Sequence, residues 1–411
     1  MRLAGFFLLT LLSLVLVLQI SSRQSADSTI FRMEQPQVAA QTNQAQIWVG
    51  APQWMSDLKS LLTLPVEEPI LKQVIKSEIQ KDENEGNFAD ALELLKVGLI
   101  LYPRDALFPY RMGMILAVFQ PDQSQQYLAL AKDEDPSLAA AADPVIQFVE
   151  TKPCSGALDS VHMGQVMGQV DEWKLADTLF TRAAETNPQL ADAWALLGQA
   201  RVMLGEDGFN QFSKALSVNP NSPVGLALMS MYWKTHQRFD LALDYMHLLN
   251  SLQPDQVSWV FELGSLYALN QDLEAAFLNY LQATAMSPKD AITWQNLAIF
   301  CLNYSVHLED AGLPAVRTLM TMEPDAPLSL TLMGQGLLKQ GDKDTAERFL
   351  IQAVQKAPEF TTAHYFLGYL YIIENNQPAA FLELVKVIEL DGDKGYGPLA
   401  RRLLEENFGP T

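Results

Sequence analysis

The chain is short of cysteine and of positive charge. It has two cysteines among 411 residues, and 28 lysines and arginines stand against 48 aspartates and glutamates, which gives a formal net charge of −20. Two cysteines cannot form the disulfide framework of a small secreted domain. The acidic balance excludes a nucleic-acid binder, which needs basic surface to replace phosphate counterions. It also argues against docking of the folded part on an anionic lipid surface.

Motifs of catalysis and metal binding are also missing. The sequence contains no His-Glu-x-x-His, no phosphate-binding loop, no Gly-x-Ser-x-Gly and no Cys-x-x-Cys. The five histidines are scattered, and we expect Cys301 to be a buried apolar residue inside a helix. We therefore predict no catalytic residue, no cofactor and no metal site, and hence no enzyme. The acidic clusters at 82–85 and 133–135 are interpreted as solvated charges at turns and helix ends.

An uncharged apolar run opens the chain. Counted from Leu3 to Ser22 it has 20 residues, about the length that a helix needs to cross the hydrocarbon core of a bilayer. This favours an uncleaved anchor over residues 1–22 that contacts the lipid bilayer through residues 3–20. The alternative is a signal peptide that is cleaved to give a secreted protein, although Gln24-Ser25-Ala26 is a poor cleavage site. In either case we expect the remainder to lie outside the cytoplasm, in the periplasm or the extracellular space.

Residues 23–70 are predicted to be a tether with a short ordered patch. Residues 21–46 are rich in Ser, Gln and Ala and contain few large apolar groups, a composition that resists packing. Trp48 and Trp54 follow, residues 57–64 are suited to a short helix, and Pro65 and Pro69 end the segment.

A repeat with a period of 32 to 36 residues occupies most of the remaining chain. Small residues recur at Gly164, Gly198, Ser230, Gly264, Ala298, Gly334 and Gly368. Prolines recur at Pro188, Pro220, Pro254, Pro288, Pro324 and Pro358. The shortest and the longest steps fall at the same places in both series, so the two series describe one repeating unit.

Each unit has the pattern of two helices. In one of them, residues 259–269 form the first helix and residues 270–272 the turn. An apolar stripe then recurs at the i, i+3, i+4, i+7 and i+8 spacing of a second helix from Leu273 to Thr284. Pro288 ends the unit because a proline cannot continue the helix.

Several positions in these units carry the same kinds of residue. They are Trp194, Trp294 and, one place off, Trp259; Leu197-Gly198, Leu263-Gly264 and Leu367-Gly368; Tyr267 and Tyr371; Ala176, Ala242, Ala276, Ala346 and Ala380; Phe180 and Tyr280; and Ala183, Ala215, Ala283 and Ala353. This pattern strongly resembles the tetratricopeptide repeat, whose period is about 34 residues. The resemblance implies an all-α fold, a right-handed superhelical solenoid of tandem helix-turn-helix repeats, here preceded by the N-terminal apolar helix.

The predicted organisation follows from the register of the repeat. Seven units fill residues 157–390 and begin at Ala157, Ala191, Pro223, Val257, Ala291, Pro327 and Thr361. Degenerate repeats occupy 71–136, an inserted segment 137–156, and a C-terminal cap 391–411.

The resemblance also implies that the first helices line a concave groove that binds a peptide segment or helix of a partner. The inward positions in this register are Val161, Gln165, Gln169, Ala195, Gln199, Ala227, Met231, Phe261, Ser265, Gln295, Ile299, Thr331, Gln335, Tyr365 and Tyr369. They comprise amides, small residues and apolar residues with almost no cations, so we expect no clamp for a terminal carboxylate.

The predicted function is a protein–protein interaction scaffold held at the membrane, with other proteins as partners. Two alternatives stay open. One is an accessory repeat subunit of an envelope enzyme or glycosyltransferase complex, and the other is a binder of small ligands or saccharides.

Substitutions at the predicted helix crossing test the register. Because the two helices of a unit cross closely, Gly264→Leu or Ala276→Phe should overpack the crossing and lower the free energy of unfolding by ~1–3 kcal/mol. Thermal melting of the two variants measures this effect. A melting temperature unchanged by both substitutions would contradict the register.

Overall fold

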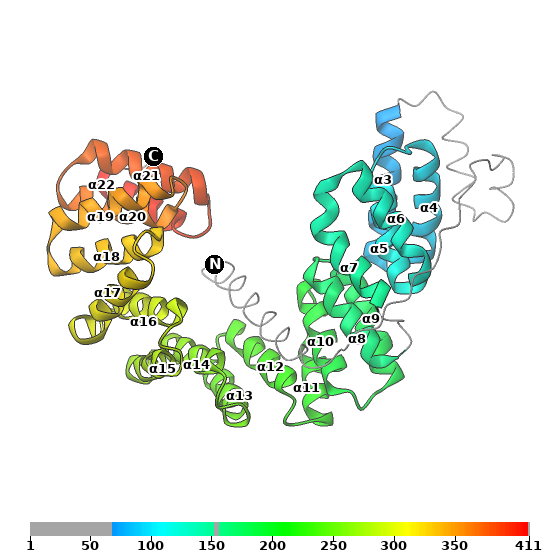
Figure 1. Cartoon of the computed structure of the whole chain (residues 1–411), viewed down its shortest axis with the longest axis horizontal. Coiled ribbons are helices and arrows are strands. Elements are labelled where there is room, and N and C mark those ends of the chain that lie inside the picture. Colours follow the sequence, from blue (N-terminus) through cyan, green and yellow to red (C-terminus); the bar gives the residue numbers. More distant parts are fainter. Residues whose placement is uncertain (1–67, 152–155, 410–411) are drawn as a thin grey trace, which may run out of the picture. The chain divides into compact units, whose positions relative to one another are not determined.

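The computed structural model describes residues 68–151 and 156–409, and all regular elements in these ranges are helices (Figure 1). The described residues fall into two compact units, an N-terminal unit of residues 68–219 and a C-terminal unit of residues 220–409. The apolar run, residues 23–67 of the predicted tether with its short helix, and Cys154 lie outside the described residues. Residues 68–70, which we assigned to the tether, form the start of a helix. Within the described ranges, none of the helices combines the length and the apolar character that a membrane span requires.

The N-terminal unit consists of helix pairs and one additional helix. The pairs are α3 (Glu68–Glu85) with α4 (Phe88–Leu101), α5 (Leu107–Phe119) with α6 (Pro121–Glu134), α8 (Ala157–Gln169) with α9 (Trp173–Thr186), and α10 (Ala191–Met203) with α11 (Phe209–Val218). A short 3₁₀ turn (Pro136–Leu138) and α7 (Ala139–Thr151) interrupt the series where the period fails in the sequence. Helix α7 packs against α5, α6 and α8, so it fills the space between two pairs.

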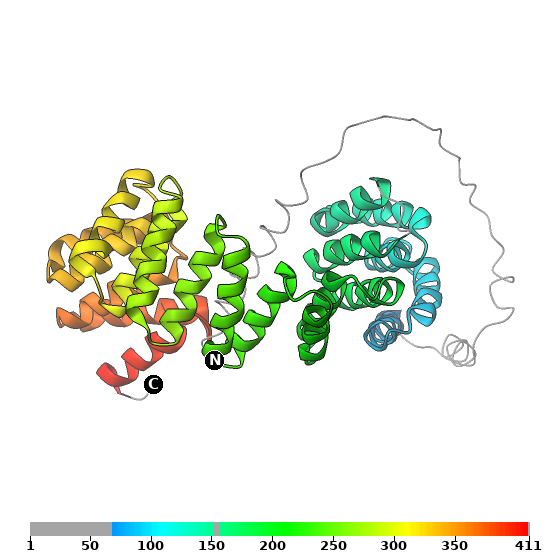
Figure 2. The same cartoon turned by 90° about the horizontal axis from the view of Figure 1, so that it is seen from below.

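The C-terminal unit continues the pairing without an inserted helix. The pairs are α12 (Pro223–Thr235) with α13 (Phe239–Leu252), α14 (Val257–Leu269) with α15 (Leu273–Met286), α16 (Ala291–Tyr304) with α17 (Leu313–Met322), α18 (Pro327–Gln340) with α19 (Lys343–Lys356), and α20 (Thr361–Ile373) with α21 (Gln377–Asp391). Figure 2 shows the pairs of this unit side by side, from green to red. The final helix α22 (Gly397–Phe408) packs on α21.

The helix starts match the register of the sequence repeat. Helices α8, α10, α12, α14, α16, α18 and α20 begin at the seven residues where the pattern starts a unit. The prediction of an all-helical chain of paired helices is confirmed for the described residues.

The recurring small residues lie where the two helices of a pair cross. A Cβ atom on Gly164 would lie 2.5 Å from the ring of Phe180, and one on Gly334 would lie 2.7 Å from Leu350. Such contacts are too short, so these two crossings admit only glycine without rearrangement. Gly264 has more room, because its Cβ would lie 3.2 Å from Tyr280. The cost predicted for Gly264→Leu therefore comes from the atoms beyond Cβ.

The unit that begins at Ala291 has a longer connection between its helices. Ser305 and His307 have positive φ angles of 55° and 47°, and residues 308–312 form one π-helical turn before α17. This turn brings Gly312 to the position that alanine holds in other units, where a Cβ would lie 2.7 Å from that of Cys301. Cys301 is fully buried, as predicted, and burial raises the pKa of its thiol to about 12. A thiol with such a pKa stays protonated and unreactive at neutral pH, so Cys301 contributes to packing.

A hydrogen bond from an aromatic side chain near the start of three first helices links each of them to the end of the preceding unit. The indole Nε1 of Trp194 donates to the carbonyl oxygen of Pro188 at 3.0 Å, and that of Trp294 donates to Pro288 at 2.9 Å. His364 occupies the same position in α20, and its Nε2 lies 3.0 Å from the carbonyl oxygen of Pro358.

The second nitrogen of His364 faces another acceptor. Its Nδ1 lies 2.5 Å from the Oε2 atom of Glu383 on α21, and the residue is 6% exposed. A carboxylate and a carbonyl oxygen can only accept hydrogen bonds, so this geometry fits the imidazolium form, in which both ring nitrogens donate. The bond with Glu383 is the main cause that raises the pKa of His364, against the effects of burial and of Lys386.

Replacing this pair should change the pH dependence of stability. The raised pKa of His364 means that its stabilising effect is complete below the unfolded-state pKa near 6.5 and is lost as the pH rises through the higher folded-state value. A variant with His364→Trp and Glu383→Gln keeps a donor to Pro358 and loses the titrating pair. Urea unfolding of both proteins at pH 5.5 and pH 8.5, values chosen on either side of histidine titration (~6.5), should show a smaller loss of stability in the variant. Equal losses would contradict the imidazolium.

Candidate functional site

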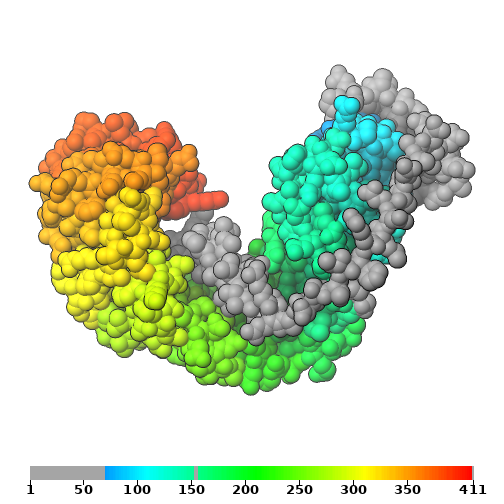
Figure 3. Space-filling view, viewed as in Figure 1, coloured from blue at the N-terminus to red at the C-terminus, as the bar shows by residue number. Residues whose placement is uncertain are grey.

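The first helices of the C-terminal unit share one face, which we call the first-helix face. Hydrogen bonds between consecutive first helices place them next to each other. The Nζ atom of Lys234 on α12 donates to the Oγ atom of Ser265 on α14 at 3.3 Å, and the Nε2 atom of Gln335 on α18 donates to the Oδ1 atom of Asn303 on α16 at 3.3 Å. In Figure 3 the yellow to red part of this unit forms one continuous packed surface.

The predicted groove residues divide between the two units, and the faces are therefore described separately. The N-terminal unit holds Val161, Gln165, Gln169, Ala195 and Gln199, and the others belong to the C-terminal unit. Six of the fifteen are buried: Val161, Ala195, Ala227, Ser265, Thr331 and Gln335. Buried side chains pack inside the array and have little surface to offer a partner.

The remaining groove residues keep accessible surface. Gln165, Gln199, Met231, Phe261, Gln295, Ile299 and Tyr365 are partly buried, whereas Gln169 and Tyr369 are exposed. Several of them also make contacts within the fold. The Nε2 atom of Gln295 lies 3.3 Å from the Oε2 atom of Glu323, and the rings of Phe261 and Tyr365 pack on those of Tyr280 and Tyr396. Tyr369 is 41% exposed and is the most open of the predicted positions in the C-terminal unit.

The first-helix face carries almost no free charge. Apart from His364, helices α12, α14, α16, α18 and α20 contain three charged residues, Lys234, Glu262 and Lys339. Lys234 is 8% exposed and forms an ion pair with Glu262, so these two charges cancel. Sequence reasoning missed this pair, although Lys234 lies one helical turn after Met231 on the same face. The exposed Lys339 donates to the Oγ atom of Ser305 at 2.7 Å.

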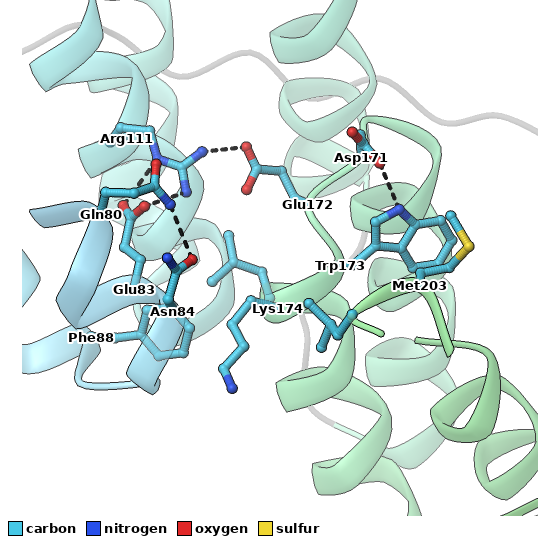
Figure 4. Close-up of a pocket in the computed structure, with 12 residues that line it drawn as sticks. Gln80, Glu83, Asn84, Phe88, Arg111, Asp171, Glu172, Trp173, Lys174 and Met203 are labelled. Atoms are coloured by element: carbon cyan, nitrogen blue, oxygen red, sulfur yellow. Dashed lines mark hydrogen bonds and ion pairs between the residues drawn. The ribbon is translucent and has the colours of Figure 1, made fainter. Parts of the chain in front are cut away.

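The N-terminal unit contains a polar cavity of about 360 Å³ (Figure 4). Arg111 on α5 lies on its wall and binds Glu83 of α3 through two parallel hydrogen bonds, Nε to Oε1 at 2.9 Å and Nη2 to Oε2 at 2.8 Å. The third donor, Nη1, bonds to Glu172 in the turn before α9. This bidentate geometry is the strongest form of a side-chain ion pair. It joins elements from three helix pairs.

The interpretation of residues 82–85 as solvated charges is wrong for Glu83. This residue is 3% exposed, and burial raises the pKa of its carboxyl group although Arg111 opposes the shift. Burial alone would lower the pKa of Arg111, but the charges of Glu172 and Glu83 outweigh that effect and raise it. The signal in the sequence was Arg111 itself, because it is the one charged residue in the otherwise apolar helix α5.

The cavity is better suited to fixing the fold than to chemistry. Both oxygens of Glu83 are used by Arg111, so this carboxylate is not placed to transfer protons to a ligand. Lys174 runs over Gly86 and points away from the two glutamates (Figure 4). In the described part of the chain, no group of three His, Cys, Asp or Glu side chains could hold a metal ion.

Comparison with known proteins agrees with this geometry. Residues 331–394, in α18–α21, match the sequence profile of the tetratricopeptide repeat family. This part of the chain carries tetratricopeptide repeats. A crystal structure of a tetratricopeptide repeat protein from Parabacteroides merdae has 14% sequence identity and a TM-score of 0.50, and the match covers 61% of this chain and 97% of that one. It shows a shared fold.

Two further proteins are similar to this chain. Yeast Tom70 is 12% identical with a TM-score of 0.41, over 86% of this chain and 91% of that chain. The general transcriptional corepressor ssn6 of Schizosaccharomyces pombe is 24% identical over 132 residues, which are 31% of this chain. The match spans 12% of the length of ssn6, so it relates parts of the two proteins and not two whole proteins.

Removing the guanidinium should destabilise the N-terminal unit. In Arg111→Met, Glu83 and Glu172 stay without their partner, and a broken buried ion pair of this kind costs ~3–5 kcal/mol. Adding Glu83→Gln should recover part of the loss, because it removes the buried negative charge. Chemical denaturation of the single and double variants measures both effects. An Arg111→Met protein as stable as the wild type would show that the cluster has no structural role.

Proposed function

We propose that this protein is a non-enzymatic scaffold that binds segments of other proteins on the first-helix faces of its tetratricopeptide repeats. The supporting observation is the chemistry of the face in the C-terminal unit. It presents amide, aromatic and aliphatic side chains, and Tyr369 and Ile373 keep 41% and 38% of their surfaces exposed. Exposed apolar groups that are mixed with amides are typical of protein-binding surfaces.

An extended segment or an amphipathic helix suits such a face. A terminal carboxylate does not, because Lys234 is buried and its charge is matched by Glu262. Binding of a carboxylate there would require breaking this pair, which leaves Glu262 without its partner.

We further propose that residues 3–20 hold the repeats at a membrane, with the folded units outside the cytoplasm. The support is the length of the uncharged apolar run, and a secreted form after cleavage is the alternative. A reporter enzyme that works only in the cytoplasm, fused after residue 411, should be inactive. Full activity of that fusion would contradict the orientation.

Capture of partners from detergent extracts tests the scaffold. A variant of the full chain with Gln165→Lys, Gln199→Lys and Tyr369→Lys should lose most of the captured protein, because each lysine puts a charge where the wild type has a neutral side chain. The matched control is Leu278→Lys with Leu382→Lys, at residues that are 55% and 68% exposed on the second helices α15 and α21. Both variants should melt close to the wild type, since none of these residues is buried.

The opposite pattern would overturn the proposal. If both variants captured the same proteins as the wild type, the first-helix faces would be the wrong surfaces. If no protein were captured and a small ligand instead raised the melting temperature, the chain would be a ligand binder.

A further inference from the structure

We propose that the polar cavity of the N-terminal unit binds a basic side chain, arginine or lysine, of a partner polypeptide. All residues that line this cavity belong to the N-terminal unit. The inference goes beyond the proposed function, because it adds a second site and names the chemistry of its ligand. None of Gln165, Gln199 and Tyr369, which probe the first-helix faces, lines the cavity.

The cavity has the size and the access that a side chain needs. Ligand pockets enclose about 300–1,000 Å³ in general, and the volume of this one, about 360 Å³, lies at the small end of that range. Four of its lining residues are exposed, so the cavity opens to solvent; they are Gln80, Asn84, Asp171 and Met203. It can therefore take one side chain with a short length of backbone.

The charges in the cavity favour a cation. Three carboxylates line it, from Glu83, Asp171 and Glu172. Two cations, Arg111 and Lys174, stand against them, so one negative charge is not balanced inside the cavity. The helix dipoles roughly cancel, because α4 and α9 begin at the cavity whereas α3 and α10 end there.

The turn before α9 keeps acceptors for a further donor. One oxygen of Glu172 is taken by Arg111, and the Oδ1 atom of Asp171 accepts from the indole Nε1 of Trp173 at 2.6 Å. The second oxygen of each carboxylate has no donor among the described residues. Lys174 does not supply one, since it points away from both carboxylates (Figure 4). A cationic group that enters the cavity therefore meets charged acceptors.

The cavity also offers apolar surface for the stem of such a side chain. Phe88, Trp173 and Met203 supply it. The indole of Trp173 is fixed, because its Nε1 is bonded to Asp171 and its benzene ring lies 2.9 Å from the position of a Cβ atom on Gly168. Lysine and arginine bury their methylene stems along apolar surface, and a cation near an indole ring gains cation–π attraction. Arginine fits best, since its planar guanidinium can stack on an indole and donate to carboxylates at the same time.

The amides at the opening of the cavity favour a polypeptide as the source of the cation. Gln80 and Asn84 are both exposed, and they hydrogen-bond to each other through the Nε2 and Oδ1 atoms at 3.1 Å. Their remaining oxygen and nitrogen can accept from and donate to the backbone of a bound segment. A basic partner also complements the net charge of −20 on this chain.

Carboxyl footprinting of the full chain in detergent tests the site without any substitution. A carbodiimide couples an amine label to accessible carboxylates, and mass spectrometry locates the label. The probe is a capped peptide with a central arginine flanked by alanines, and the control peptide carries citrulline, which has the same shape and no charge. We expect the arginine peptide to lower the labelling of Asp171 and Glu172 several-fold and the citrulline peptide to leave it unchanged. Asp133 and Glu134, an exposed pair at the end of α6, should be labelled equally in all samples.

A variant with Asp171→Asn and Glu172→Gln tests the two charges. Asparagine tolerates the left-handed backbone at this position, where φ is 64°, and its carbonyl oxygen still accepts from Trp173. Glutamine still accepts from Arg111. A fluorescent arginine peptide should bind this variant at least about tenfold more weakly than the wild type, as expected for lost hydrogen bonds to charged groups.

The matched control carries Asp133→Asn and Glu134→Gln, which make the same charge change outside the cavity. It should bind the arginine peptide as the wild type does. Both variants should melt close to the wild type, because the substituted side chains keep their size and their acceptors. If the test variant did not fold, the footprinting of the wild type would still decide.

Equal labelling of Asp171 and Glu172 with and without the arginine peptide would overturn the inference. It would leave the scaffold standing, because other residues form the first-helix faces. Protection by the citrulline peptide as strong as by the arginine peptide would also overturn it, since the cavity would then not recognise charge. Equal protection by n-butylguanidine, which lacks a backbone, would contradict a polypeptide ligand. Conversely, a protected cavity in a chain that captures no protein through its first-helix faces would contradict the scaffold and leave this site standing.

Discussion

The close crossing of the two helices in each pair is the constraint on which the rest of the structure depends. At Gly164, Gly334 and Gly368 an added Cβ atom would come within 2.8 Å of a side chain on the opposite helix, so these crossings have no room for a larger residue. At Ser230 the hydroxyl group uses the same proximity and donates to the carbonyl oxygen of Ala242 at 2.8 Å. Because this contact is made inside each pair, the pairs can stack one after another, and their first helices form common faces.

The departures from the pattern show what the fold tolerates. The longer connection after α16 is accommodated by two residues of positive φ and a π-helical turn, and Gly312 still restores the crossing against Cys301. Between consecutive units, His364 replaces an indole and keeps the hydrogen bond to a proline carbonyl oxygen. It also gains Glu383 as a second partner, which adds a charged group to this contact. Each departure preserves a contact between helices and changes the chemistry around it.

The sequence predicted the repeat well because its register depends on positions where few residue types fit. Sterics favour small residues at a crossing, and a proline ends the second helix of a pair, so their spacing placed the starts of seven first helices. It predicted the polar contacts poorly. Glu83 looked like a solvated turn charge, and its partner Arg111 lies 28 residues away, a pairing that only the stacking of helices creates. Likewise, six groove positions such as Thr331 proved to be buried, because the register gives the direction of a side chain but not how closely the next helix covers it.

Our proposal is that partners recognise the neutral first-helix face and not the second helices. The most direct test places a photoreactive amino acid in the full chain, either at Tyr369 on α20 or at Leu278 on α15, and identifies what each position cross-links in an extract of the native cells. The account predicts that a partner protein is captured from Tyr369 and not from Leu278. Capture from Leu278 alone would contradict it.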